Sequence, residues 1–345
     1  MCMTNQLKKL RDYLKTKKTS NQLCWRIFFY CKDRTIKPIF EWNNRVAHRR
    51  WKKKYDRNKH LTEEYKKQLQ EVFKGVLLTR PIPCKIGAGV ELHTLTCHHH
   101  VNMYILALKS LLRFTNDVSV VAHDDGSLSQ EDMQLIEKHI PGINIIVRSE
   151  ADSKLEPILK EYPQIRSYRK KIVDSLEILD HIILANTERI ITMNSDILFL
   201  KRPCQLIDWL NIDPRSYLYV YESSPAYQKE FLEEIGCSFP PHLTLAAACV
   251  YTDIMDLDLI ERLVTSSTVL NEHLWVADQN MYPALMDQRK DKYSSVVFDQ
   301  ERYDASGIIR PGAEFRHYWS SSGTLLQFHI KDSMKVISEL QDEIL

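Results

Sequence analysis

The sequence predicts an α/β protein with a mostly parallel central sheet flanked by helices, preceded by a basic helical extension. From about residue 90, apolar runs of strand length alternate with amphipathic runs of helix length, a pattern typical of a parallel sheet covered on both faces. Basic and acidic residues are also distributed unevenly along the chain. Residues 1–85 hold 23 Lys and Arg against 7 Asp and Glu, whereas residues 86–345 hold 24 against 38. We therefore expect a basic helical region, 1–85, and an α/β domain, 86–345.

The extension ends in a predicted amphipathic helix, LTEEYKKQLQEVFKG, at residues 61–75. Thr62 is the expected N-cap, and Gly75 is expected to end the helix. The apolar stripe that predicts the helix consists of Leu61, Tyr65, Leu69 and Phe73.

Two segments upstream of this helix concentrate aromatic residues and charge. They are NQLCWRIFFYC at residues 21–31 and RRWKKKYDRNK at residues 49–59. They form the solvated basic face of a helical cap, or they bind an anionic lipid surface through aromatic residues surrounded by lysines. A nucleic-acid surface is a third reading, but no recognised nucleic-acid motif accompanies the charge, so we expect no nucleic-acid partner.

Composition argues against a membrane-spanning or secreted chain. No run of 18 apolar residues occurs, so we expect no transmembrane helix. The first 18 residues lack the apolar core and cleavage site of a secretory signal. The eight cysteines include no C-x-x-C pair, which indicates reduced thiols. We expect a cytoplasmic protein, with peripheral contact at the inner face of a membrane through residues 1–60 as the lipid-binding alternative.

The elements of the α/β domain are expected in alternating order. Four strands are predicted within residues 91–100, 117–123, 144–149 and 189–194. Helices are predicted at residues 101–114, at 129–142 with Ser129 as N-cap, and over one segment with the apolar stripe Tyr168, Ile172, Leu176 and Leu179. Because ligands on such sheets bind beyond the carboxyl ends of the strands, the polar residues at those ends are the candidates for a site.

The fourth strand delivers Asn194, Ser195 and Asp196 between two apolar runs, in RIITMNSDILFLKRP (189–203). A buried carboxylate is unfavourable unless a partner neutralises it. One interpretation is an ordinary strand-to-turn exit with Asp196 in an Asx turn. The other is that a partner outside the strand neutralises Asp196.

This segment resembles the D-x-D motif of the GT-A class of nucleotide-sugar glycosyltransferases, in the form DSD-ILF-KRP, and the resemblance covers residues 90–330. It implies a GT-A fold in which Asp196 binds Mn²⁺ or Mg²⁺ against the diphosphate of the donor. Asn194 and Ser195 would lie beside the sugar nucleotide. The class usually has aspartate where this chain has Asn194, which leaves weak metal binding, metal independence and an inactive site as alternatives.

The resemblance extends to the end of the first strand, where the class lines the nucleotide pocket with small polar groups. In this chain those positions are Thr94, Thr96 and His98. Three histidines in a row, 98–100, also raise the possibility of a metal site. Their side chains diverge and no partner ligand follows four residues later, so we expect none there.

Three further places in the sequence follow from the resemblance. Asp124 and Asp125 open a DDGS sequence after the second strand, where the class has an acidic contact to the base or ribose; a bare turn is the alternative. Lys171, in SYRKKIVD, matches a helical lysine that reaches the sugar nucleotide, with a solvated basic turn as the alternative. The small residues 246–248 match a strand that approaches the donor sugar, although close packing explains them equally well.

The last candidates lie towards the C-terminus. The resemblance makes Asp278 the candidate catalytic carboxylate, with Gln279 beside it, whereas a helix N-terminus is the ordinary explanation for an acid at that position. His317 and His329 are alternative candidates for a late histidine that completes the metal site. Lys331, suited to holding the departing phosphates, favours His329.

We therefore expect a glycosyltransferase that moves a sugar from a nucleotide-diphosphate donor, UDP-linked, to a hydroxyl of a saccharide, a lipid-linked saccharide or a protein. Departure of the nucleotide diphosphate would be assisted by Mn²⁺ or Mg²⁺. One alternative is a non-catalytic nucleotide-sugar-binding protein with a degenerate site. The other is a nucleotidyltransferase, but the expected Gly-rich basic loop after the first strand is CHHHVN here.

Overall fold

The computed structural model describes residues 62–221, 233, 236–237, 243–265, 277–304, 309–318 and 323–342, with the backbone alone for 243–245, 277–280 and 323–324. Residues from Thr62 onward form one unit. The aromatic run and the cationic block lie outside the described residues, so both remain predictions. No helix among the residues described has the length and apolarity to cross a bilayer.

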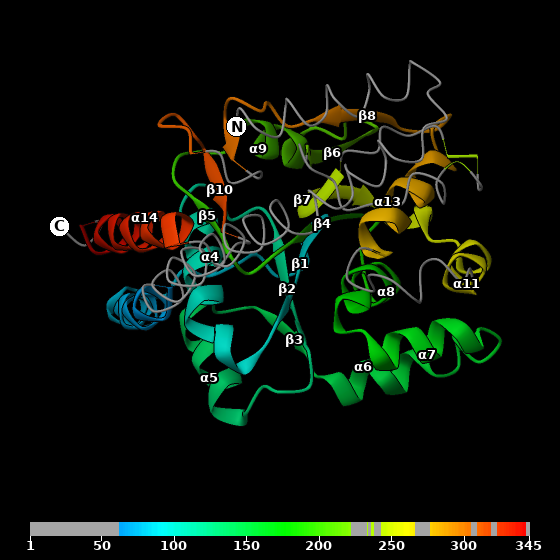
Figure 1. Cartoon of the computed structure of the whole chain (residues 1–345), viewed down its shortest axis with the longest axis horizontal. Coiled ribbons are helices and arrows are strands. Elements are labelled where there is room, and N and C mark those ends of the chain that lie inside the picture. The colour runs from blue at the N-terminus through cyan, green and yellow to red at the C-terminus, as the bar shows by residue number, and fades with distance from the viewer. Residues whose placement is uncertain are drawn as a thin grey trace, which may run out of the picture. The chain divides into compact units, whose positions relative to one another are not determined.

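A seven-stranded sheet forms the centre of the unit (Figure 1). Its strands, in spatial order, are β3 (Asn144–Ile146), β2 (Ser119–Asp124), β1 (Val90–Thr96), β4 (Arg189–Met193), β7 (Leu243–Tyr251), β6 (Ser216–Tyr221) and β8 (Ser294–Val297). Strand β7 is antiparallel to β4 and β6, and the other pairings are parallel. The predicted fold class, α/β with a mostly parallel sheet, is confirmed.

The register brings the carboxyl ends of three strands to one edge of the sheet. Thr96 at the end of β1 pairs with Asp124 at the end of β2, and His93 pairs with Thr192 of β4. The residues that follow these three strands therefore lie close together, as the strand-end argument requires.

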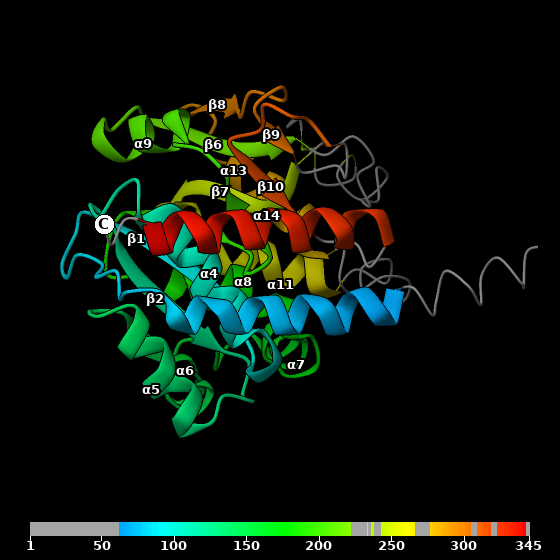
Figure 2. The same ribbon diagram turned by 90° about the vertical axis from the view of Figure 1, so that its left-hand side faces the viewer.

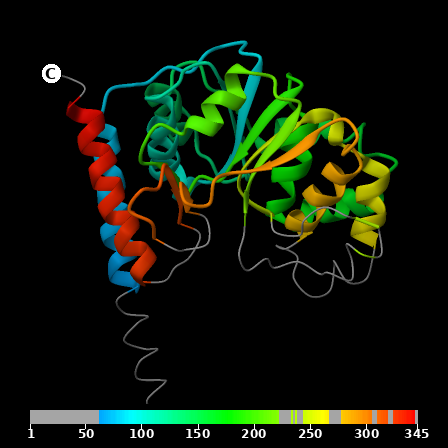
Figure 3. The same ribbon diagram turned by 90° about the horizontal axis from the view of Figure 1, so that it is seen from above.

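Helices cover both faces of this sheet (Figures 1 and 3). Helix α8 (Leu176–Ile183) packs on β1, β2 and β4, and α13 (Ala277–Asp287) packs on β7. Helix α4 (Val101–Leu112) lies on the opposite face and is buried except at Asn102. Further α-helices in the described part of the unit are α5 (Gln130–His139), α6 (Arg148–Leu155), α7 (Pro163–Lys171), α9 (Cys204–Asn211), α11 (Leu257–Thr265) and α14 (Gly323–Asp342).

Ser129 is the N-cap of α5, as predicted. Its hydroxyl accepts from Asp132 N at 3.2 Å, and Asp132 Oδ2 accepts from Ser129 N at 2.8 Å, a reciprocal capping box.

The prediction of one continuous helix through Tyr168, Ile172, Leu176 and Leu179 is wrong. Helix α7 ends before Ile172, which is extended, and the 3₁₀ turn η4 (Val173–Ser175) precedes α8. The Ser175 hydroxyl donates to Ile172 O at 2.6 Å, so a local side-chain hydrogen bond replaces a helical one. This break redirects the chain beside the carboxyl ends of β1, β2 and β4.

Residues 62–74 form a helix that lies beside α14 (Figures 2 and 3) and continues into the 3₁₀ turn η2 (Gly75–Leu78). Leu69 and Phe73 of the predicted stripe are buried, and Tyr65 is partly buried. The Phe73 ring meets the His329 ring of α14 edge-on, with centroids 5.1 Å apart. This helix, from the basic region of the sequence, thus packs into the core of the α/β unit.

A second, three-stranded sheet continues the chain after β4. It consists of β5 (Ile197–Phe199), β10 (Phe315–His317) and β9 (Tyr303–Asp304). Strands β5 and β10 are antiparallel, and His317 pairs with Ile197. This register carries His317 to the residue that precedes β5, Asp196.

Candidate active site

A cavity of about 240 Å³ opens at the carboxyl edge of the main sheet. The ends of β1, β2 and β4 form one side of it, and η4 with the start of α8 forms the other. It is lined by Leu95, Thr96, Cys97, His100, Asp125, Val173, Asp174, Glu177, Asn194, Ser195 and Asp196. Thr96, Asp125, Asn194, Ser195 and Asp196, predicted from separate parts of the sequence, are thus brought together.

Asp196 meets His317 at this edge. Asp196 Oδ1 lies 3.0 Å from His317 Nε2, and Asn194 Nδ2 lies 3.5 Å from the same nitrogen. Tyr318 N donates to Asp196 O at 3.0 Å, which joins β10 to the end of the motif. Burial alone would raise the pKa of Asp196, but the neighbouring rings of His317 and His329 outweigh it and the pKa is lowered.

His329, on α14, is buried close to this contact. Its ring stacks on Tyr318 and is only 2% exposed. Burial lowers the pKa of His329 to about 3, against the opposing effect of Asp196, so the imidazole is neutral. It lies on α14, whereas His317 lies on β10 beside the carboxylate.

A buried ionic cluster fixes β10 against α14. Arg316 Nη1 and the Tyr318 hydroxyl both donate to Asp332 Oδ2, the latter at 2.7 Å. Arg316 Nε donates to Asp304 Oδ2 at 3.0 Å. His317 lies between these two anchored residues, so the cluster fixes the backbone from which its ring reaches Asp196.

The donor atoms at Asp196 fit a divalent cation. Across the described ranges, no three His, Cys, Asp or Glu side chains are grouped as a metal centre. His329 Nε2 is nevertheless a buried atom without a hydrogen-bond partner in the described part of the chain, and Asp196 Oδ1 is a buried oxygen that faces His317 Nε2. Mg²⁺ and similar ions are often held by one or two side chains together with substrate phosphates, so an oxygen from Asp196 and a nitrogen from His317 form a suitable pair.

The two aspartates of the DDGS sequence have different surroundings. Asp124 Oδ1 accepts from Gly126 N at 2.8 Å and from Leu128 N at 3.0 Å, so this carboxylate holds the turn together. Asp125 Oδ1 accepts from Ser127 at 2.9 Å, and Asp125 also lines the cavity. Asp125 is therefore the one placed to contact a ligand.

Two of the histidines that follow β1, His98 and His100, also have different surroundings. His98 Nδ1 contacts Asp132 Oδ2 at 2.7 Å, at the cap of α5, and does not line the cavity. His100 does line it, with Nδ1 3.5 Å from Ser195 Oγ. Thr94 is fully buried within the sheet, and only Thr96 reaches the cavity.

Asp174 and Glu177 also line the cavity and were not singled out from the sequence. Burial raises the pKa of Asp174. The signal that could have found Asp174 is the sequence KIVD at residues 171–174, in which Asp174 is the acid of the K-hydrophobic-x-D pattern that singled out Lys171.

The other predicted residues do not meet at this cavity. Lys171, at the end of α7, and Lys331, on α14, are exposed and do not line it. Asp278 and Gln279 lie in the first turn of α13, which packs against α8 and η4, but their side chains are outside the described part. Residues 246–248 are buried in β7, where Ala246 O accepts from Asn194 N at 3.1 Å.

No protein-family model and no curated protein matches this chain. Mouse xyloside xylosyltransferase 1 has a similar structure, with 12% identity, a TM-score of 0.44, and coverage of 67% of this chain and 97% of that one. The galactosyltransferase LgtC, solved with donor and acceptor sugar analogs, has 10% identity, a TM-score of 0.46, and coverage of 72% and 95%. The glycosyltransferase GlyE of Streptococcus pneumoniae has 12% identity, a TM-score of 0.45, and coverage of 74% and 63%. These similar structures are glycosyltransferases, the class whose D-x-D motif the segment at 189–203 resembles.

Proposed function

We propose that this protein transfers a sugar from a nucleotide-diphosphate donor, UDP-linked, to a hydroxyl acceptor. The observation that carries the proposal is the Asp196–His317 contact of 3.0 Å beside a cavity at the carboxyl ends of three parallel strands. Ligands of open α/β sheets bind at this edge.

The charge of the cavity favours a cation as part of the bound complex. Its lining holds the carboxylates of Asp125, Asp174, Glu177 and Asp196 and no lysine or arginine from the described residues. A diphosphate would be repelled by these groups at close range. Asp196 and His317 would hold Mn²⁺ or Mg²⁺, which, when bound, neutralises the charge that grows on the departing diphosphate.

The remaining polar groups would bind and orient the sugar nucleotide. Thr96, Ser195 and Asn194 offer hydroxyl and amide groups that both donate and accept, which suits sugar hydroxyls. Asp174 lines the cavity and burial raises its pKa, so it is the candidate carboxylate for proton exchange with an acceptor hydroxyl. Asp278 and Gln279, in the turn of α13 beside η4, remain candidates for contact with either sugar.

A non-catalytic nucleotide-sugar-binding protein is the second candidate. It is favoured by Asn194, whose amide, in place of a second carboxylate, lies 3.5 Å from His317. An amide supplies an oxygen ligand without charge, so it would hold the cation less strongly than the usual aspartate.

The test is thermal unfolding with a panel of UDP- and GDP-sugars in Mn²⁺, in Mg²⁺ and in EDTA. A donor at 100 times its Kd stabilises the folded state by about 2.7 kcal/mol. We expect a metal-dependent shift in the wild type that Asp196→Asn abolishes. The matched control is Asp117→Asn, an exposed acid paired with Lys85.

Three outcomes separate the candidates. A metal-dependent shift together with release of nucleotide diphosphate in the presence of acceptors supports transfer. A shift without release across a broad acceptor panel supports the binding protein. No shift with any donor, in a folded protein, contradicts both.

A further inference from the structure

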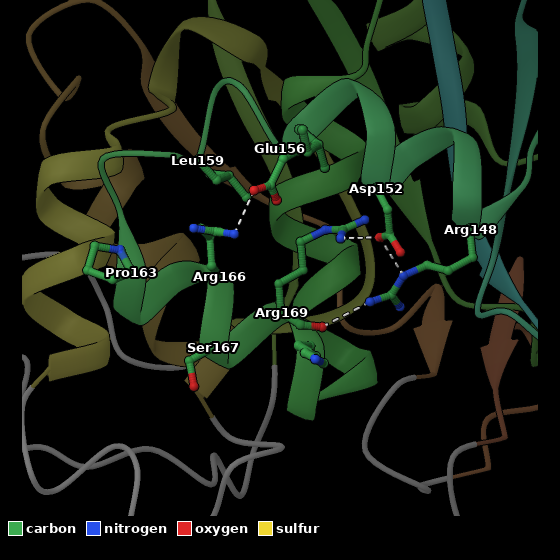
Figure 4. A pocket seen from close by; sticks show the side chains of 10 residues that line it. Arg148, Asp152, Glu156, Leu159, Pro163, Arg166, Ser167 and Arg169 are labelled. Atoms are coloured by element: carbon green, nitrogen blue, oxygen red, sulfur yellow. Dashed lines mark hydrogen bonds and ion pairs between the residues drawn. The ribbon is translucent and has the colours of Figure 1, made fainter.

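A second cavity, of about 550 Å³, lies between α6 and α7 and differs in charge from the first (Figure 4). Four cationic side chains line it, against the two acids Asp152 and Glu156. The cationic residues are Arg148, Arg166, Arg169 and Lys170. The lining residues therefore carry an excess of two positive charges, of which one is offset by Asp180 behind Arg169, whereas the candidate active site is lined by carboxylates.

Two of the guanidinium groups are held in place before any ligand arrives. Asp152 Oδ1 accepts from Arg148 Nε at 2.9 Å and from Arg169 Nη1 at 2.5 Å. Arg169 also donates to both oxygens of Asp180, at 2.7 and 2.6 Å. Arg148 Nη2 donates to Arg169 O at 3.2 Å. Within the described structure this uses two of the five N–H groups of Arg148 and leaves three to contact a ligand.

The other two cations are less constrained. Arg166 pairs with Glu156 at 2.6 Å, but both side chains are largely exposed, at 44% and 62%, so the pair is easily exchanged for a stronger partner. Lys170 has no acidic partner among the residues that the structure describes. Ser167, between them on α7, adds a hydroxyl.

The two cavities are neighbours along two segments of the chain. Arg148 N donates to Asp124 Oδ2 at 3.3 Å, and the next residue, Asp125, lines the candidate active site. On the other side, Lys170 lines the basic cavity and Asp174, four residues later, lines the acidic one. A ligand with a neutral sugar and an anionic group could therefore contact both.

We propose that the basic cavity binds an oxyanion of the phosphate class, carried by the acceptor or present as free phosphate; the acceptor source rests on the proposed function. Arginine forks and a lysine suit the several oxygens of a phosphate group. The diphosphate of the donor belongs at Asp196, so this second anion is a separate one.

The experiment is titration with inorganic phosphate in EDTA, at constant ionic strength set with chloride, followed by calorimetry. We expect saturable binding to the wild type. Arg166→Ala with Lys170→Ala should weaken it at least about tenfold, because two charge-assisted contacts are lost. Lys154→Ala is the control for one charge on α6, since Lys154 pairs with Glu150 and does not line the cavity.

Asp196→Asn separates this proposal from the proposed function, because it should leave phosphate binding unchanged. If a hexose 6-phosphate binds more tightly than both inorganic phosphate and free hexose, the acceptor is the source. Equal affinity for hexose phosphate and inorganic phosphate assigns the site to free phosphate. Absence of saturable phosphate binding, or equal loss in Lys154→Ala, overturns the proposal.

Discussion

The rings of His329 and Tyr318 stack with centroids 3.8 Å apart and planes 6° apart. Tyr318 is also held by its hydroxyl, which donates to Asp332 three residues beyond His329 on the same helix. Two contacts thus attach the end of β10 to one side of α14. His317, the neighbour of Tyr318, is held against Asp196 as a consequence.

Tyr318→Phe should keep the stack and remove the hydroxyl. We expect the free energy of unfolding to fall by about 1–2 kcal/mol, since a buried hydrogen bond to a charged group is lost. Urea unfolding measures it. Tyr318→Ala should cost more, about 3–5 kcal/mol, because a buried aromatic ring is removed as well. Equal losses for the two variants would contradict the part assigned to the stack.

His317→Ala and His329→Phe distinguish the two late histidines. His317 lies 3.0 Å from Asp196, so its loss should abolish the Mn²⁺-dependent part of donor stabilisation. Phenylalanine preserves the stack on Tyr318, so His329→Phe should leave most of that stabilisation in place. The reverse result would make His329 the ligand, as the position of Lys331 in the sequence favoured.

Asp180→Asn should destabilise the fold strongly. Its carboxylate is 3% exposed and pairs with Arg169, which is 8% exposed. The substitution would leave the buried Arg169 with the half-exposed Asp152 as its acidic partner, and we expect a loss of about 3 kcal/mol in the free energy of unfolding, the lower end of the range for breaking a buried pair. The exposed pair Lys85–Asp117 is the comparison, and Asp117→Asn should lose less than about 1 kcal/mol. Similar losses would mean that burial does not set the strength of these pairs.

Acid should destabilise the protein through three buried histidines. His93 of β1, His123 of β2 and His181 of α8 lie in contact between the sheet and this helix, with ring centroids 4.6 to 5.6 Å apart. Burial lowers the pKa of each below 6.5, against the opposing effect of Glu91 on His93. The unfolded chain then binds protons more readily than the folded chain, so stability is full above pH 6.5 and falls as pH decreases below it.

The slope can reach about 1.4 kcal/mol per pH unit for each histidine that stays neutral in the fold. Urea midpoints between pH 7.5 and 5 measure it. His123→Gln should reduce the slope, and the exposed His99→Gln should not. An unchanged slope in His123→Gln would exclude the cluster as its source.

Much of the site could be predicted because its residues follow strands. Asp196, Asn194 and Thr96 come directly after apolar runs, and the parallel register brings such positions to one edge. It is harder to predict which of several neighbouring strand-end residues faces the cavity. His98 caps α5 through Asp132 while His100 lines the cavity, a difference that depends on a contact 34 residues away. Asp124 is taken up for a local reason, because its carboxylate accepts hydrogen bonds from Gly126 and Leu128 in its own turn.

The end of helix α7 before Ile172 was missed for a different reason. Spacing alone fits Tyr168, Ile172, Leu176 and Leu179 to one helix, but the Ser175 hydroxyl competes for the carbonyl of Ile172. Neither the placement of Asp174 in the acidic cavity nor that of Lys170 in the basic one follows from periodicity. Asp174 lies in the 3₁₀ turn η4, where the N–H and the hydroxyl of Ser175 both donate to Ile172 O, whereas Lys170 lies on α7 before this turn.

The pairing of the helix at 62–74 with α14 has a consequence for the order of folding. Tyr65 and Gln327 are hydrogen-bonded although 262 residues separate them, and Phe73 touches His329. Asp196 emerges from the ribosome well before β10 and α14 are synthesised. The carboxylate therefore gains its histidine neighbours only when β10 and α14 pack against it, a long-range closure that carries a high entropic cost. Strands β1 to β4 come earlier in the chain, so the carboxyl edge of the sheet can form before the histidine side of the site is added.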